Sequence, residues 1–326
     1  MNIMKAIRFH ETGGPEVLTL EEVELAPPGP GEVTVRLAAI GVNFIETYQR
    51  SGLYKLPLPS GLGGEGAGTV EAVGNGVTDF QIGDRVAYCT ASPGSYAEAQ
   101  NVLATKLIHL PDEIGFETAA AAMLKGLTAQ YLLKQTYVVK KGETILFHSA
   151  AGGVGLIASQ WAKHLGARVI GTVGSDSKIA LAQENGCDLV LNLNQDDWVA
   201  KVKEANGGKG LAVVYDSVGK DTFAGSLDCL APRGLMVSFG NSSGAVDPFS
   251  PTLLSQKGSL YLTRPTLFHY ASTPQELQAM ADDLFAVLAT GAVKIAVNQR
   301  FELKDARAAH QALQSRQTTG ATVLIP

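Results

Sequence analysis

The stretch GETILFHSAAGGVGLIASQWAK, residues 142–163, contains a short strand, a turn of small residues and a helix in immediate succession. Residues 144–147 have the β-rich composition of a buried strand. Beyond the turn, apolar residues recur at the spacing of one helical face, at Val154, Ile157, Ala158, Trp161 and Ala162. A second strand is predicted over residues 168–173, so the stretch indicates a β-α-β unit.

The turn between the strand and the helix matches the glycine fingerprint of dinucleotide-binding folds, except that Ala150 occupies the first glycine position. Gly152 lets the main chain approach a pyrophosphate, and Gly155 lets the helix pack closely on the strand. The free N–H groups and the dipole of the helix N-terminus favour an anion at this point. An isolated match of this kind often marks only a tight turn, but the β-α-β context favours nucleotide binding.

Strands and helices alternate through the rest of this region. We expect further strands over residues 189–193, 211–217 and 235–240, and helices that begin at Ser177, Asp196 and Asp221. This alternation predicts a doubly wound parallel sheet of the Rossmann type.

The first third of the chain has a different pattern, with short alternating β segments divided by turn residues. The expected strands are 6–9, 17–25, 33–42, 66–73, 85–88 and 96–107. Over residues 111–134 the apolar residues recur at the spacing of a helix, and here the chain passes into the nucleotide-binding region. Near the end we expect helices over 276–288 and 306–314 and a strand over 322–325. The fold class predicted is therefore α/β, with a β-rich domain beside the parallel-sheet domain.

Composition limits the classes of partner. The formal net charge is 26 − 31 = −5 and there is no basic run, which disfavours nucleic acid and anionic membrane surfaces. The start of the chain is charged where a signal peptide is apolar, and no segment is long enough to span a bilayer. We therefore expect a cytoplasmic protein that does not bind membranes. Cys89, Cys187 and Cys229 form neither a disulfide framework nor a CxxC pair, which predicts buried, reduced thiols.

The ordered motifs of the chain resemble those of the zeta-crystallin-like NADPH:quinone oxidoreductases, in the zinc-lacking part of the medium-chain dehydrogenase/reductase superfamily. Besides the glycine turn they are GVNFIETYQRSGLY from residue 41, LKGLTAQYLL from 124, VVYDSVG from 213, GLMVSFGNSSG from 234 and the ending SRQTTGATVLIP. The resemblance implies a GroES-like catalytic domain over 1–126 and 269–326 and a Rossmann domain over 127–268. It also implies a homodimer through the edge strand near 259–265; alternatively, the chain's own loop covers that edge.

The choice of cofactor depends on the residues after the second strand of the fold, where an acid binds the ribose hydroxyls and repels the 2′-phosphate of NADPH. The run Gly-Ser-Asp-Ser-Lys over residues 174–178 offers room, a hydroxyl donor at Ser175 and a positive charge at Lys178, which favours NADPH. Alternatively, Asp176 turns inward to bind the ribose and Lys178 is only solvated. Leu193 is a departure, because the family often has a tyrosine there as a further phosphate contact.

Zinc-containing relatives have a cysteine early in the first domain and a His-Glu pair in a glycine-rich stretch. This chain has Asn43 at the first place and Gly64-Glu65 at the second, so it lacks the thiolate and the imidazole that zinc binds. We predict no metal site. Without a Lewis acid, the expected chemistry is hydride transfer from reduced nicotinamide to an electron-poor acceptor, a quinone or an α,β-unsaturated carbonyl.

The resemblance assigns roles to individual residues. It implies that Asn43, Tyr48 and Tyr54 lie around the nicotinamide and the acceptor, with Tyr48 able to donate a hydrogen bond to a developing oxyanion. Either tyrosine, Tyr54 above all, could instead be a packing aromatic, and Thr128 could bond only its own helix. The cofactor-binding residues implied are Asn43, Thr128, Ala151, Gly152, Gly153, Val154, Ser175, Lys178, Phe239, Gly240, Ser242 and Arg316.

Three functions follow from this sequence. The first is an NADPH-dependent quinone oxidoreductase, and the second is an enone or alkenal double-bond reductase that uses the same chemistry. The third is a cofactor-binding crystallin or an RNA-binding protein, as some relatives are. The intact glycine turn with Asn43 and Tyr48 favours an enzyme, and the acidic charge balance disfavours RNA.

Overall fold

The computed structural model describes residues 2–195 and 197–326, which form two compact units. The first unit comprises Met1–Lys125, Ser272–Ala281 and Ile295–Pro326, and the second comprises Gly126–Ala271 and Asp282–Lys294. The domain limits expected from the sequence stay a prediction; residues 282–294, which that prediction assigns to the first domain, group with the second unit.

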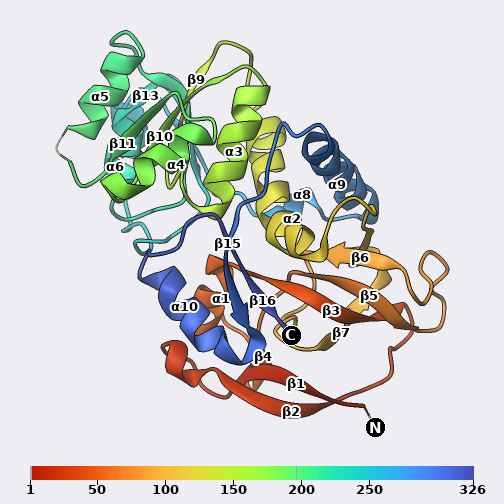
Figure 1. Ribbon diagram of the computed structural model, residues 1–326. Helices are drawn as coiled ribbons and strands as arrows, with labels where there is room; N and C mark the ends of the chain where they lie inside the picture. The colour runs from red at the N-terminus through yellow and green to blue at the C-terminus, as the bar shows by residue number, and fades with distance from the viewer. Residues whose placement is uncertain (1, 196) are drawn as a thin grey trace. The chain divides into compact units, whose positions relative to one another are not determined.

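The second unit is built on six parallel strands in the order β11-β10-β9-β12-β13-β14. Taken in chain order, the strands run 3-2-1-4-5-6 across the sheet, which is the order of dinucleotide-binding folds. The predicted doubly wound sheet is thereby confirmed (Figure 1). Its strands are β9 (Thr144–Phe147), β10 (Arg168–Val173), β11 (Leu189–Asn192), β12 (Leu211–Asp216), β13 (Leu230–Ser238) and β14 (Tyr261–Thr263).

Helices connect these strands and flank the sheet (Figure 1). Within the second unit they are α3 (Gly153–His164), α4 (Ile179–Glu184), α5 (Trp198–Ala205), α6 (Phe223–Asp228), α7 (Thr252–Gln256) and α8 (Leu267–Tyr270). Two longer helices, α2 (Phe116–Tyr131) and α9 (Pro274–Ala289), contain residues of both units, and α2 continues into a π-helical turn. The predicted helix start at Asp196 lies outside the described residues; α5 begins at Trp198.

Apolar side chains on the strands form the core of the second unit. Leu146, Ile170, Val214 and Met236, one from each of four neighbouring strands, belong to a single buried cluster. Because parallel strands are covered on both faces, they read as near-continuous apolar runs, which is how the sequence revealed them. Trp161 of α3 is also fully buried, as its place in the apolar stripe predicts.

The first unit is β-rich, as predicted. One sheet has the order β15-β16-β3-β5-β6-β8, with β7 also paired to β3, and a smaller sheet has the order β2-β1-β4. The strands are β1 (Asn2–Phe9), β2 (Thr19–Leu25), β3 (Glu32–Val42), β4 (Ser60–Gly61), β5 (Gly66–Val73), β6 (Arg85–Tyr88), β7 (Ala99–Leu103), β8 (Ile108–His109), β15 (Val297–Glu302) and β16 (Ala321–Ile325). Two α-helices lie wholly within this unit, α1 (Phe44–Arg50) and α10 (Ala306–Gln314).

Some predicted strands of the first unit need correction. The strand predicted over 17–25 begins only at Thr19, because residues 15–17 form a 3₁₀ turn that starts with Pro15. The strand predicted over 96–107 is limited to Ala99–Leu103, since a second 3₁₀ turn follows it. Strand β15 was not predicted, because its sequence VNQRFE is mostly polar and half exposed.

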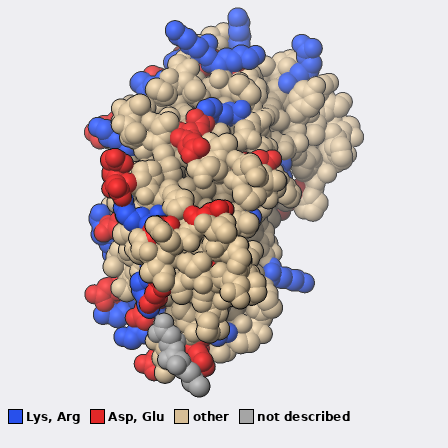
Figure 2. All heavy atoms as spheres, turned by 90° about the vertical axis from the view of Figure 1, so that its right-hand side faces the viewer, with Lys and Arg blue, Asp and Glu red and all other residues tan. Residues whose placement is uncertain are grey.

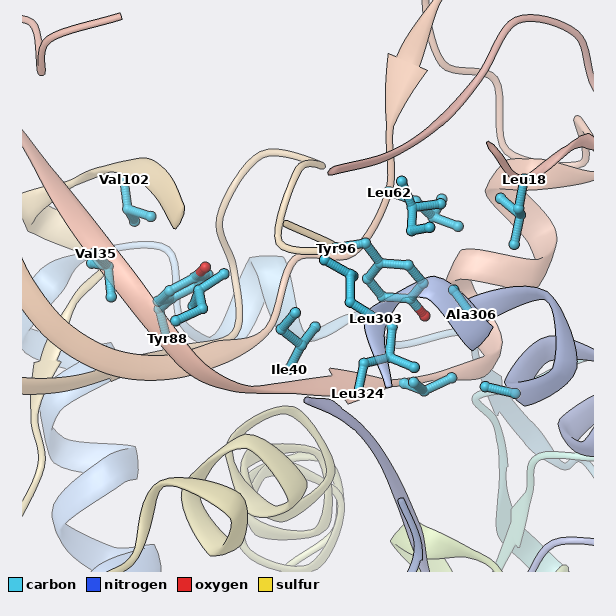
Figure 3. Close-up of a cluster of buried hydrophobic side chains, with 14 of the residues drawn as sticks. Leu18, Val35, Ile40, Leu62, Tyr88, Tyr96, Val102, Leu303, Ala306 and Leu324 are labelled. Carbon is cyan, nitrogen blue, oxygen red and sulfur yellow. The ribbon is translucent and has the colours of Figure 1, made fainter. Parts of the chain in front are cut away.

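The core of the first unit lies between its strands and α10. Figure 3 shows Val35 and Ile40 of β3 with Tyr88 of β6 and, farther along the cluster, Leu324 of β16 and Ala306 of α10. All of these side chains are buried. Burial of aliphatic side chains from both ends of the chain joins the last strand and helix to the β-rich domain.

A buried polar contact fixes the C-terminal end of α1. Arg50, which is 1% exposed, places Nη1 3.0 Å from His310 Nδ1 and donates from Nη2 to Gln314 Oε1 at 2.9 Å. Because the guanidinium can only donate, His310 Nδ1 accepts and its Nε2–H faces the Tyr96 hydroxyl at 3.1 Å. Burial, together with the nearby Arg50 charge, lowers the pKa of His310 to about 3.

This histidine makes stability depend on pH. Its ordinary pKa of 6.5 lies above the folded value of about 3, so the unfolded chain binds the extra proton and stability falls as the pH drops below about 6.5. Between pH 7 and pH 5, the free energy of unfolding should fall by about 2 kcal/mol more in the wild type than in His310→Gln. Urea titrations of both proteins at the two pH values measure this; equal losses would show that His310 does not titrate on unfolding.

Among the described residues, no helix is long and apolar enough to cross a bilayer. Cys89, Cys187 and Cys229 are free and buried, as predicted. The face drawn in Figure 2 is largely uncharged and carries acidic and basic side chains together along its left edge.

Candidate functional site

The glycine turn lies at the carboxyl end of β9, where α3 begins. Leu156 N donates to Gly152 O at 2.9 Å, which is the first helical hydrogen bond, so the N–H groups of residues 153–155 precede it in the first turn. A Cβ at Gly155 would lie 2.2 Å from Ser149 O and 2.7 Å from Ala150 Cα. Only glycine therefore lets α3 start this close to the end of β9, as the fingerprint predicts.

The alanine at the first glycine position is accommodated by the neighbouring strand. Ala150 is fully buried, and its N–H donates to Thr172 O of β10 at 2.9 Å. A Cβ on Gly171 would lie 2.7 Å from the Ala150 Cβ and 2.6 Å from Cys187 Sγ. The Ala150 methyl group therefore fits because position 171 in β10 is a glycine, and the turn keeps its close contact with the sheet.

The loop after β10 brings two of the predicted cofactor residues, Ser175 and Lys178, together. A Cβ on Gly174 would meet no atom within 4 Å, so the space beside this residue is open. Ser175 precedes a 3₁₀ turn over Asp176–Lys178, and Lys178 N donates to Ser175 O at 3.2 Å. Because β10 is hydrogen-bonded to β9, this loop and the glycine turn share one edge of the sheet.

Asp176 has partners that bear on the choice of cofactor. Its Oδ1 accepts hydrogen bonds from Asn192 Nδ2 at 2.8 Å and from Gln195 Nε2 at 3.3 Å. Asn194 Nδ2 donates to Gly174 O at 2.8 Å and ties the same loops together. The carboxylate is thus engaged by the last residue of β11 and by the loop that follows, which favours the NADPH interpretation over a ribose-binding acid.

The third group of predicted residues follows β13. The Phe239 ring lies 5.6 Å from the Phe147 ring at the end of β9, and Ser242 N donates to Ser217 O at 3.2 Å. Arg264, which the sequence analysis did not assign to the site, donates from Nη1 to Ser238 O at 3.1 Å and to Gly240 O at 2.9 Å. Arg264 therefore holds the loop that carries Phe239, Gly240 and Ser242.

A buried hydrogen-bonded chain lies directly before the glycine turn. The His148 imidazole has Nδ1 2.7 Å from Thr172 Oγ1 and Nε2 2.9 Å from Ser226 Oγ. Ser226 uses its only proton to donate to Asp216 Oδ2 at 2.8 Å, so it accepts from His148, which carries its proton on Nε2. Burial lowers the pKa of His148 and keeps it neutral. The chain joins β9, β10, β12 and α6 beneath the turn.

Asp216 is the acceptor at the end of this chain and is fully buried. Its Oδ1 accepts from Val218 N at 2.8 Å and from Gly219 N at 3.0 Å. Its Oδ2 accepts from Thr222 Oγ1 at 2.7 Å in addition to Ser226. Four donors thus compensate one buried carboxylate, which fixes the loop after β12.

The predicted catalytic residues are all in the first unit, where two of them are in contact and the third caps the same helix. Asn43 is the N-cap of α1, and Tyr48 lies in the same helix. The Tyr48 and Tyr54 rings meet edge to face at 5.4 Å, and Tyr54 N donates to Tyr48 O at 3.0 Å. Tyr54 is 38% exposed, so it is not simply a buried packing residue.

The cofactor residues predicted from the resemblance are distributed over both units. Asn43 and the exposed Arg316, which follows α10 with a positive φ of 59°, belong to the first unit. Thr128 is buried in the part of α2 that belongs to the second unit. The remaining predicted residues lie at the carboxyl edge of the second unit's sheet: Ala151, Gly152, Gly153, Val154, Ser175, Lys178, Phe239, Gly240 and Ser242.

At the positions where zinc-containing relatives have their zinc ligands, this chain has different side chains. Asn43 Nδ2 donates to Glu65 Oε2 at 2.8 Å, and Lys125 Nζ lies 3.5 Å from the same oxygen. Over residues 2–195 and 197–326, no group of three or more His, Cys, Asp or Glu side chains could hold a metal ion. The donor set here is an amide, a carboxylate and an ammonium, which does not suit zinc.

Comparisons with known proteins cover the whole chain. A family model described as the alcohol dehydrogenase GroES-like domain matches residues 29–143, and one described as zinc-binding dehydrogenase matches residues 153–285. A quinone oxidoreductase of Pseudomonas aeruginosa is 58% identical over 323 residues, which cover 99% of each chain. The 2-haloacrylate reductase of a Burkholderia species is 45% identical over 332 residues, again with 99% of each chain covered.

Solved structures agree with this match. The structure of Escherichia coli quinone oxidoreductase complexed with NADPH is 53% identical, with a TM-score of 0.98, and the alignment covers 99% of this chain and 100% of the other. The Rossmann and GroES-like folds expected from the resemblance are therefore both present.

Proposed function

Because the chain belongs to the zinc-lacking quinone oxidoreductases of the medium-chain dehydrogenase/reductase superfamily, we propose that it reduces quinones with NADPH. The observation that carries the proposal is the main-chain cradle at residues 150–155, beside an open space at Gly174. Bound NADPH supplies a hydride to the electron-poor acceptor. The chain's own residues bind and orient the two reactants.

The residues of the second unit fit a dinucleotide phosphate. The N–H groups of residues 153–155 and the dipole of α3 favour the pyrophosphate. Gly174 leaves room for a 2′-phosphate, and Ser175 and Lys178 supply a hydroxyl donor and a positive charge within one turn. Phe239, Gly240 and Ser242 extend the same edge of the sheet, where ligands of open α/β sheets bind.

In the first unit we assign Asn43, Tyr48 and Tyr54 to the nicotinamide and the acceptor. The Tyr48 hydroxyl donates a hydrogen bond to the acceptor oxygen, on which negative charge develops as the hydride is added. Thr128 and Arg316 complete the proposed cofactor contacts, Arg316 by its charge. These hydrogen bonds stabilise the negative charge that develops on the acceptor.

The test is a panel of acceptors assayed with each nicotinamide cofactor. Purified protein should oxidise NADPH faster with quinones than with any other acceptor, followed by the loss of absorbance of the reduced nicotinamide. Failure to oxidise NADPH with every quinone in the panel would contradict the proposal. The 2-haloacrylate reductase relative supports the alternative, a double-bond reductase. A higher kcat/KM with α,β-unsaturated carbonyls or carboxylates than with quinones would favour it.

Lys178 should determine the preference for NADPH. Lys178→Ala is expected to weaken NADPH binding by about tenfold and to leave NADH binding within about twofold, because only NADPH carries the 2′-phosphate. Titration calorimetry with both cofactors measures the two affinities, with Lys201→Ala on the exposed side of α5 as a matched control. Equal losses for NADPH and NADH would show that Lys178 does not contact the phosphate.

We also propose a homodimer through β14. This strand is at the edge of the parallel sheet, so its outer main-chain groups are open to pairing with another strand. The side chain of Tyr261 in this strand is 61% exposed, and a second copy of the chain would cover it. Sedimentation should give twice the chain mass of 34.2 kDa, and Tyr261→Asp should shift the protein toward that single-chain mass. A wild type that sediments as one chain at micromolar concentration would exclude the dimer.

We place the protein in the cytoplasm. Its three cysteines are free and buried, which suits a reducing compartment, and NADPH is the proposed reductant. Detection of the protein in a secreted or periplasmic fraction of the producing cell would contradict this location.

A further inference from the structure

Four polar side chains are buried together in the first unit, at the N-terminal end of α1. They are Asn43, Glu46, Glu65 and Lys125, and none is more than 6% exposed. Asn43 and Glu46 come from the cap and first turn of α1, whereas Glu65 immediately precedes β5 and Lys125 lies in α2. Charged side chains are rarely buried to this extent without a specific partner or a function.

The Glu65 carboxylate is the centre of the cluster. Its Oε2 accepts from Asn43 Nδ2 at 2.8 Å and lies 3.5 Å from Lys125 Nζ, while its Oε1 accepts from Leu124 N at 2.6 Å. A Cβ on Gly41 would lie 2.0 Å from Oε2, so β3 leaves room for this carboxylate. Glu65 thus joins the cap of α1 to α2 through both of its oxygens.

The charges of the cluster balance when Glu46 is protonated. Burial raises the pKa of Glu46 to about 8, against the opposing effect of Lys125. With Glu46 protonated, the pair of Glu65 with Lys125 is the ion pair of the cluster. A buried ion pair seldom stabilises a fold more than apolar residues would, but the loss of one partner leaves the other charge uncompensated.

Asn43 is the member of the cluster that the proposed function places at the nicotinamide and the acceptor. Its side-chain nitrogen is directed at Glu65 and, more weakly, at Glu46 Oε1 at 3.5 Å. Its main-chain N–H donates to Glu46 Oε2, which completes the capping contact of α1. The orientation of the Asn43 amide therefore depends on where the Glu65 carboxylate is held.

We propose that Lys125 is a positioning residue of the reaction, whose ammonium holds the Glu65 carboxylate and, through it, the Asn43 amide. The inference rests on the proposed function, because Asn43 is assigned to the reactants there. Lys125 itself contacts the carboxylate and takes no part in binding the pyrophosphate or the 2′-phosphate. Its loss should therefore lower turnover much more than it weakens the binding of NADPH, whose phosphate contacts stay intact.

The experiment compares Lys125→Met, Glu65→Gln and the double variant with the wild type. Lys125→Met should lower kcat by about 10- to 100-fold, as losses of residues that orient a reacting group do, with the calorimetric Kd for NADPH within about twofold. In the double variant, Glu65→Gln removes the carboxylate charge that Lys125→Met leaves without a partner, and the glutamine keeps an oxygen that can accept from Asn43. The double variant should therefore recover to within about tenfold of the wild-type kcat. Lys134→Met, which breaks the partly buried Lys134–Asp283 pair, is the matched control and should keep the wild-type kcat.

Two results would overturn the inference: a wild-type kcat in Lys125→Met, or a double variant no more active than Lys125→Met alone. If Lys125→Met does not fold, Lys125→Gln, which keeps a donor toward Glu65, replaces it and is judged by the same recovery with Glu65→Gln. A purely structural role would lower the melting temperature and leave kcat of the folded protein unchanged. Failure of the proposed function appears separately, as a wild type that reduces no acceptor.

Discussion

Gly155→Val is expected to abolish high-affinity nucleotide binding. The new Cβ would lie 2.2 Å from the main-chain oxygen of Ser149 and 2.7 Å from Ala150 Cα, and neither atom belongs to a side chain that could rotate away. The start of α3 must therefore move, and its N–H groups move with it. We expect the Kd for NADPH to rise by about 100-fold or more, since an ångström-scale displacement of a binding group has effects of that size.

The same substitution should cost about 1–3 kcal/mol of stability, as overpacking in a dense region does. Titration calorimetry and urea unfolding measure the two effects. Gly115→Val is the matched control, because a Cβ there would meet no atom within 4 Å, and its NADPH affinity should equal that of the wild type. An unchanged Kd in Gly155→Val would mean that the turn is not the nucleotide-binding element.

Asp216→Ala is expected to be the most destabilising single substitution in the second unit. It leaves the N–H groups of Val218 and Gly219 and the hydroxyls of Thr222 and Ser226 buried without their acceptor. Because each unmade buried hydrogen bond costs about 1–3 kcal/mol, the loss in the free energy of unfolding should be at least about 3 kcal/mol. Urea titration at pH 7 measures it.

Asp216→Asn provides the comparison. Its amide keeps an oxygen for Val218 N and Gly219 N, and the two hydroxyls can rotate to accept from its nitrogen. We expect it to lose less than half of what Asp216→Ala loses. A loss below about 1 kcal/mol in Asp216→Ala would show that the buried chain contributes little to the edge of the sheet that carries the glycine turn.

Much of the fold could be predicted from local pattern. The strands at 66–73, 85–88, 144–147 and 168–173 and the helix at 306–314 begin and end where the sequence places them. These segments carry a clear period of two or of 3.6 residues, or are continuous apolar runs between turn residues. Where the apolar period is weak no element was predicted, as for the polar strand β15.

The parts of the site that escaped prediction depend on contacts between distant residues. Lys125 and Glu65 are in contact although they are 60 residues apart in the sequence, and His148 and Ser226 although they are 78 residues apart. No local spacing in the sequence reveals either pair. The close contact of Ala150 with Gly171 is similar, because only the pairing of β9 with β10 brings the two residues together. The glycine turn itself was predictable because its chemistry is contained in six consecutive residues.

The central claim, that the cradle at residues 150–155 binds a reduced pyridine nucleotide, is tested most directly by titration calorimetry of the purified wild-type chain with NADPH and with NADH. Our account predicts one binding site per chain and a lower Kd for NADPH than for NADH. Heat of dilution alone with both nucleotides would contradict it.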